Sequence, residues 1–152
     1  MKKRTDKGAV KIEEIKGKAD NESKLYRRSI LFLFVLCFLL YGKSIKNDYA
    51  MDDEFVIKGN VQVQKGIKAI PEIFTSTYVV DNQKSSYEYR PIVKALYAVE
   101  YPFFGLKPHL SHFFNILLYA LSIILLYSVL LKLLIGYNRI LPFLITLLFL
   151  IH

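Results

Sequence analysis

The chain has no tryptophan and only one cysteine among its 152 residues, and each shortage narrows what the protein can be. Cys37 has no partner cysteine, so no disulfide framework can form, and the chain offers too few ligands for a zinc site. Its aromatic residues are eleven Tyr and eleven Phe, which is typical of anchoring at a membrane interface rather than of a base-stacking platform. No RNA- or DNA-binding motif is present, and we therefore expect no nucleic-acid partner.

Charge is missing from long stretches of the chain, although its formal net charge is +8. Basic residues outnumber acidic ones two to one in residues 1–28, residues 29–41 carry no charge, and the chain beyond residue 107 is almost entirely apolar. This segregation indicates a membrane protein. The basic excess adjoins an apolar run, which favours a role in membrane orientation over nucleic-acid binding.

Three apolar segments predict transmembrane helices. They occupy residues 29–45, residues 112–135 and residues 140–152, the last being the start of a helix. The second is long enough to span outright, at about 34 Å, whereas the uncharged core of the first reaches only about 20 Å and needs flanking residues whose charged ends snorkel outward. A signal peptide is the competing interpretation of the first segment, but the long leader and the lack of a small-x-small cleavage site disfavour it.

Basic residues near the segment ends set the expected orientation. They place residues 1–28, a basic tail, and residues 136–139, a short turn, in the cytoplasm, so that residues 46–111 form an outer loop. In this loop Pro91 is expected at a first helical position. The predicted fold is all-α: a polytopic membrane protein with about three transmembrane helices and a helical first outer loop. The Lys- and Ile-rich composition suggests a bacterial cytoplasmic (inner) membrane, with membrane lipid as a partner.

The third apolar segment ends at His152 without a polar flank. A terminal carboxylate in or near hydrocarbon is costly, by at least a few kcal/mol. We therefore expect this sequence to be the N-terminal part of a longer protein.

Three consecutive acids, Asp52, Asp53 and Glu54, lie just beyond the first apolar segment. Neighbouring carboxylates can differ in pKa, so that one acts as general base toward an acceptor hydroxyl while the other orients it or binds a metal. The alternative is a solvated turn or a helix cap. The three acids by themselves leave both interpretations open.

The order and spacing of three stretches carry a more specific resemblance: "NDYAMDDEFVIKGNVQVQKGIKAIPEIF", "YRPIVKALYAVEYPFFGLKPHLSHFFNILLYAL" and "LPFLITLLFLIH". Together they resemble the start of the multi-spanning C-type glycosyltransferases, and most closely the transmembrane and tetratricopeptide-repeat group of protein O-mannosyltransferase relatives. The resemblance covers nearly everything from Asn47 to His152 and leaves out the basic tail.

That resemblance implies an enzyme that takes a sugar, possibly mannose, from a polyprenyl-phosphate donor and passes it to a protein or glycan acceptor on the outer face. Asp52 and Asp53 match the acidic pair of the family, one as the acceptor-activating base and the other as its positioning partner. Arg90 matches a position suited to binding the donor phosphate, and His112 and Asn115 match an H-x-x-N pattern. The resemblance leaves open whether a divalent metal takes part, and the fragment alone is expected to be inactive.

Other interpretations stay open for several of these residues. Arg90 could be an interfacial side chain, and His112 and Asn115 could form interhelical hydrogen bonds. His109 and His112 lack a third ligand for a metal site. The whole chain could instead be a small non-enzymatic three-span anchor or assembly protein, or its outer loop could bind a sugar or peptide without turnover.

Overall fold

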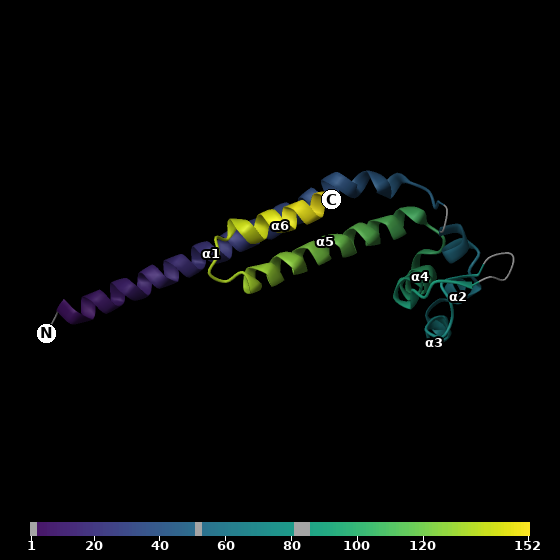
Figure 1. Ribbon diagram of the computed structural model, residues 1–152, viewed down its shortest axis with the longest axis horizontal. Coiled ribbons are helices and arrows are strands. Elements are labelled where there is room, and N and C mark those ends of the chain that lie inside the picture. The colour runs from purple at the N-terminus through teal and green to yellow at the C-terminus, as the bar shows by residue number, and fades with distance from the viewer. Residues whose placement is uncertain (1–2, 51–52, 81–85) are drawn as a thin grey trace. The chain divides into compact units, whose positions relative to one another are not determined.

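The computed structural model describes residues 3–50, 53–80 and 86–152 (Figure 1). The chain divides into two compact units, each treated by itself below. The helical unit comprises Met1–Leu40 and Leu117–His152, and the loop unit comprises Tyr41–Ile116. Among the described residues the fold is all-helical, apart from a two-residue ladder that pairs β1 (Val79–Val80) with β2 (Ser86–Tyr87).

The helical unit is built from three helices: α1 (Lys3–Tyr41), the part of α5 (Pro108–Leu133) from Leu117 onward, and α6 (Ile140–Ile151). The first residues of α5 belong to the loop unit. Helix α1 includes most of the predicted basic tail, because residues 3–28 contain no proline and many good helix formers such as Lys, Glu and Ala. An ion pair of 2.7 Å between Lys24 and Asp20, one helical turn apart, supports this half of the helix.

Among the described residues, two helices are long and apolar enough to cross a membrane. The first is Lys16–Lys46, in which the end of α1 continues into a 3-10 helix, and the second is Pro108–Leu133. The third apolar helix, α6, has 12 residues and reaches only about 18 Å. The sequence predicted about three transmembrane spans. In the part of the chain that the structure describes, two helices are each long enough to form a span.

The three helices contact one another through a narrow seam. The hydroxyl groups of Tyr26 and Ser128 lie 2.9 Å apart, and the ring of Tyr26 stacks on that of Tyr127 with centroids 6.0 Å apart. The Tyr119 hydroxyl donates to the carbonyl oxygen of Phe149 at 3.1 Å. The fully buried side chains on the seam are Leu33, Cys37, Ala120, Ile123, Thr146 and Leu150.

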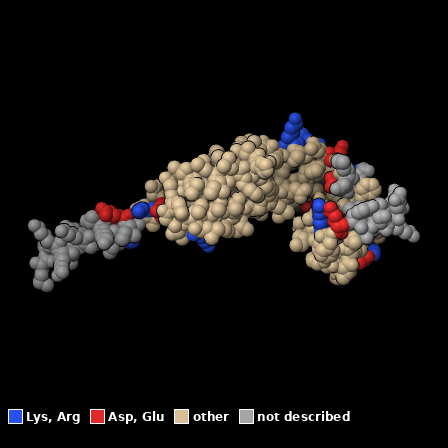
Figure 2. All heavy atoms as spheres, in the orientation of Figure 1, with Lys and Arg blue, Asp and Glu red and all other residues tan. Residues whose placement is uncertain are grey.

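Most apolar side chains of the helical unit lie outside this seam. Leu39 is 75% exposed and Ile135 is 79% exposed, and Figure 2 shows the visible face over these helices as a nearly uncharged surface. Exposure of so large an apolar surface to water is unfavourable, whereas lipid chains would cover it.

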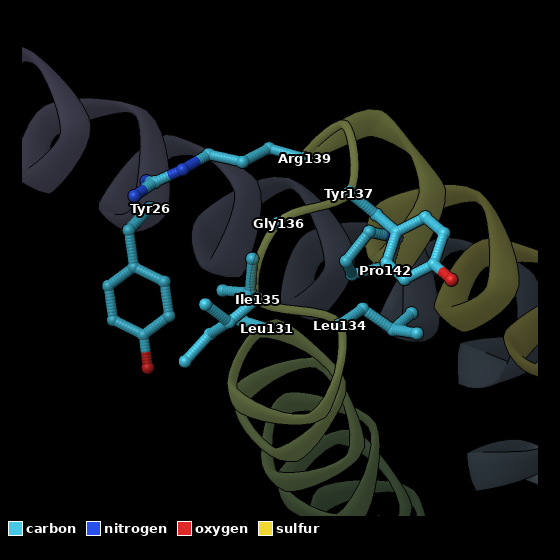
Figure 3. Close-up of a pocket in the computed structure, with 8 residues that line it drawn as sticks. All are labelled: Tyr26, Leu131, Leu134, Ile135, Gly136, Tyr137, Arg139 and Pro142. Carbon is cyan, nitrogen blue, oxygen red and sulfur yellow. The ribbon is translucent and has the colours of Figure 1, made fainter.

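A hollow of about 220 Å³ lies in the helical unit beside the turn between α5 and α6 (Figure 3). Arg139 extends from this turn to α1, where its Nη2 lies 2.8 Å from Oε2 of Glu22. Tyr26 and Leu131 line the same hollow. Its arginine is engaged by Glu22, and none of its described lining residues carries a carboxyl or imidazole group.

The loop unit is organised around α4 (Pro91–Phe104), which begins at the proline where the sequence predicted a helix start. Four short elements precede α4: η2 (Glu54–Lys58), α2 (Val61–Gln64), η3 (Gly66–Ala69) and α3 (Ile70–Ile73). Asn60 caps α2, because its side-chain oxygen accepts hydrogen bonds from the backbone N–H groups of Gln62 and Val63. The 3-10 helix η1 (Gly42–Lys46) continues from the end of α1.

Two small apolar clusters hold α4 against these elements. The first consists of Tyr49, Val56, Ile57 and Val63, with Tyr78, Tyr97 and Tyr101 packed on it. The second consists of Ala69, Ile73 and Ala98. Tyrosines thus cover the first cluster, and their hydroxyl groups lead to the polar site described next.

Candidate active site

A chain of hydrogen bonds links three segments of the loop unit. The Ser111 hydroxyl, in the first turn of α5, donates to Oε2 of Glu100 on α4 at 2.9 Å. The Tyr49 hydroxyl lies 3.3 Å from the same Ser111 oxygen. Because the single proton of Ser111 goes to Glu100, Tyr49 is the donor to Ser111. The order of donation is therefore Tyr49 to Ser111 to Glu100.

Glu100 is partly buried, and this burial raises the pKa of its carboxyl group above the ordinary value, against the opposing effect of the Ser111 hydrogen bond. Burial also raises the pKa of Tyr49, and the nearby charges of Glu100 and Asp53 raise it further. A carboxylate with a raised pKa is a stronger base than an exposed one. Glu100 is therefore suited to proton transfer.

Asp53 lies close enough to Tyr49 for its charge to act on the phenol. Its backbone N–H donates to the Ala50 carbonyl at 3.1 Å, and its Oδ2 accepts from the Ala50 N–H at 3.4 Å. These two hydrogen bonds fix Asp53 relative to Ala50. The negative charge of Asp53 acts on Tyr49 and on Tyr97.

Tyr97 lies at the centre of the site. Burial, together with Tyr78, Asp53 and Glu100, raises its pKa to about 12, while a hydrogen bond with the Asn115 side chain acts in the opposite direction. Its phenol therefore stays protonated at neutral pH and can donate a hydrogen bond. We refer below to the carboxylate–tyrosine cluster, which consists of Tyr49, Asp53, Tyr97, Glu100, Ser111 and Asn115.

The other site residues expected from the sequence lie at different positions. Arg90 has its guanidinium 5.5 Å from the ring centroid of Tyr78 and its Nε 2.7 Å from Oε2 of Glu88. His112 has a buried Nε2 with no hydrogen-bond partner among the described residues. Asp52 lies outside the described residues.

The structure gives no metal-binding arrangement in the part of the chain that it describes, where no three His, Cys, Asp or Glu side chains come together. His109 is engaged elsewhere, because its Nδ1 lies 2.7 Å from the Ile45 carbonyl oxygen and so must donate to it.

Sequence reasoning missed Glu100, Tyr97, Tyr49 and Ser111. One signal was present, since Glu100 is the only acid in the largely apolar helix "PIVKALYAVEYPFF". An acid on an apolar helix is buried only with a partner, and this partner is Ser111.

Comparisons with protein-family models, curated proteins and solved structures found no match for the chain.

Proposed function

We propose that this chain supplies the acceptor-activating outer loop of a membrane glycosyltransferase that uses a polyprenyl-phosphate sugar. The observation that carries the proposal is the carboxylate–tyrosine cluster, in which the Asp53 and Glu100 carboxylates act on the same pair of phenols. Ser111 and Asn115 belong to the first two turns of α5, a helix long and apolar enough to cross a membrane. Such a position suits a reaction between a membrane-held donor and an acceptor outside.

The reaction needs a base for the acceptor hydroxyl. The acceptor oxygen forms a bond to the anomeric carbon, the bond from that carbon to the phosphate oxygen breaks, and its electron pair leaves with the polyprenyl phosphate. The hydroxyl proton passes to a carboxylate. Asp53 is the proposed base, with Asp52 as its positioning partner, and the raised pKa of Glu100 makes it a second acceptor for the proton.

Arg90 is the proposed ligand of the donor phosphate, because a guanidinium can bind phosphate through two parallel hydrogen bonds. Its present partner is Glu88, and both side chains of this pair are more than half exposed. An exposed ion pair contributes about 0–1 kcal/mol, so exchange of Glu88 for a phosphate costs little. His112 and Asn115 are the proposed contacts to the substrates near the start of α5. A divalent metal could join the phosphate there, but no ligand set for it is proposed.

The proposed setting is a bacterial cytoplasmic membrane, with the N-terminus in the cytoplasm, the loop unit outside and α6 contributing to a third span. Its support is the exposed apolar surface of α1, α5 and α6 and the cluster of basic residues before the first apolar segment. The acceptor would be a protein or a glycan, and the transferred sugar possibly mannose.

The test is sugar transfer in membranes that contain the natural product of the gene, including whatever is encoded beyond His152. With a radiolabelled polyprenyl-phosphate mannose donor, Asp53→Asn is expected to lower the transfer rate by about 10²–10⁴-fold, the usual contribution of a general base. Asp48→Asn is the matched control, because Asp48 is an exposed acid five residues away. Full activity in both Asp52→Asn and Asp53→Asn would refute the proposed base.

A second candidate function, a non-enzymatic membrane anchor, is favoured by one observation. The helical unit exposes its apolar side chains, and no described residue that lines its hollow carries a carboxyl or imidazole group. The same assay separates the two candidates, since an anchor shows no transfer with any polyprenyl-phosphate sugar and no change on substitution of Asp53.

A further inference from the structure

Lys94 is the most deeply buried charged side chain among the described residues, with only 3% of its surface exposed. It lies in the second turn of α4, and its Nζ donates to the Thr77 carbonyl oxygen at 2.9 Å. Burial lowers the pKa of Lys94, while the nearby charge of Glu72 raises it. A lysine ammonium has three hydrogens, and a single backbone carbonyl leaves most of its capacity unused.

A pocket of about 230 Å³ opens beside this ammonium. Polar groups of Asn60, Gln62, Ser76 and Thr77 form part of its wall, and Phe55 and Val61 form an apolar part. The pocket is smaller than the sites that hold drug-sized ligands, which run from about 300 to 1,000 Å³. Its size suits a short organic group with one polar end.

The polar wall of this pocket is held in place by its own hydrogen bonds. Ser76 Oγ donates to Gln62 Oε1 at 3.0 Å, and Gln62 Nε2 donates to Glu72 Oε1 at 2.9 Å. Glu72 also accepts from Lys65 Nζ at 3.2 Å. Lys65 and Lys94 both lie near the single charge of Glu72, so this group of three side chains carries a net positive charge.

The charges of Lys94 and its neighbours Glu72 and Lys65 favour an anion with one negative charge. Phosphate monoesters carry nearly two negative charges at neutral pH, which one lysine beside Glu72 does not balance. A carboxylate carries one charge and accepts two or more hydrogen bonds through its two oxygens.

We propose that this pocket binds the carboxylate of a small organic acid, with the Lys94 ammonium as its charged ligand and Phe55 and Val61 against its short apolar part. The proposal concerns a site separate from the carboxylate–tyrosine cluster and does not depend on the proposed sugar transfer. None of the proposed site residues for sugar transfer lines this pocket, namely Asp52, Asp53, Arg90, His112 and Asn115.

The test measures butyrate binding to the full chain in detergent micelles by ligand-observed NMR. Wild type is expected to bind butyrate, and Lys94→Met is expected to weaken binding at least tenfold, since methionine keeps most of the side-chain volume and removes the charge. Lys68→Met, which changes an exposed lysine of the same unit, is the matched control and is expected to bind as wild type does.

Val61→Phe provides a second variant, which keeps Lys94 and narrows the pocket. Val61 is 66% exposed, so a larger side chain there should not disturb folding, and weaker butyrate binding is expected. Unchanged affinity in both Lys94→Met and Val61→Phe would overturn the site. Displacement of butyrate by dimethyl phosphate or chloride at equal or lower concentration would overturn the carboxylate assignment.

Discussion

The Ser111 hydroxyl donates a 2.9 Å hydrogen bond to the Glu100 carboxylate, joining the first turn of α5 to α4. Ser111 is only 6% exposed, so water does not readily replace either partner. The hydrogen bond therefore stabilises the folded loop unit, and it also lowers the pKa of Glu100 against the effect of burial.

Removal of this donor is expected to destabilise the loop unit. Ser111→Ala leaves Glu100 without its hydrogen-bond donor and Tyr49 without its acceptor, and an unsatisfied buried group costs about 1–3 kcal/mol. Thermal unfolding in detergent, followed by circular dichroism, measures the loss. Ser122→Ala, at an exposed position of the same helix, is the control and should change the midpoint little. An equal shift in both variants would contradict a specific role for Ser111.

The pH dependence of stability is expected to carry the signature of Glu100. Its pKa is higher in the folded protein than the ordinary value of 4.5, so the folded state binds this proton more tightly than the unfolded chain does. The stabilising contribution is complete below that ordinary value and is lost as the pH rises through the folded pKa.

Glu100→Gln removes this pH-dependent contribution and retains an oxygen that accepts from Ser111. Between about pH 4 and about pH 7, its unfolding midpoint should therefore fall less with rising pH than that of wild type. The measurement is a pair of thermal unfolding series, with Glu13→Gln as the control at an exposed acid. Parallel curves for wild type and Glu100→Gln would show that Glu100 is not buried as described.

Gly66 is expected to tolerate no side chain. Its φ is +70°, and a Cβ at this position would lie 2.7 Å from Pro102 Cγ on α4. The left-handed conformation alone costs an alanine about 1–2 kcal/mol, and the contact with Pro102 adds to that.

Unfolding of Gly66→Ala, compared with that of wild type, should therefore show a loss of more than about 1 kcal/mol. Gly42→Ala is the matched control in the same unit, because a Cβ there meets no atom within 4 Å. A Gly66→Ala protein as stable as Gly42→Ala would mean that η3 does not approach α4 as described.

The elements predicted best from the sequence are those set by local chemistry. The apolar runs gave the two long helices, and Pro91 marks the start of α4 because its ring fixes a helical φ and it has no N–H to leave unbonded. The basic tail was predicted only as a tail. Its helix was not predicted, because the interpretation of residues 1–28 rested on their charge and not on the helix propensity of their Lys, Glu and Ala side chains.

The candidate site was predicted only in part, because burial depends on contacts between distant segments. Asp53 and Asn115 both act on the Tyr97 phenol, and their part in a shared site stays a prediction. Sequence spacing does not single out Glu100 or Lys94, because the burial of each depends on which segments pack against α4. The Tyr97 pKa likewise depends on residues spread from Asp53 to Asn115 in the chain.

Helix α1 runs from Lys3 to Tyr41 without a proline, so its charged half and its apolar half form one rigid rod. Successive residues on such a rod are separated by a fixed angle of about 100°, which ties the direction of every side chain to that of every other. A partner that grips the charged half therefore also sets the direction in which Leu33 and Cys37 face. A rotation of the charged end of α1 therefore also rotates its apolar end, because α1 contains no proline that would kink it.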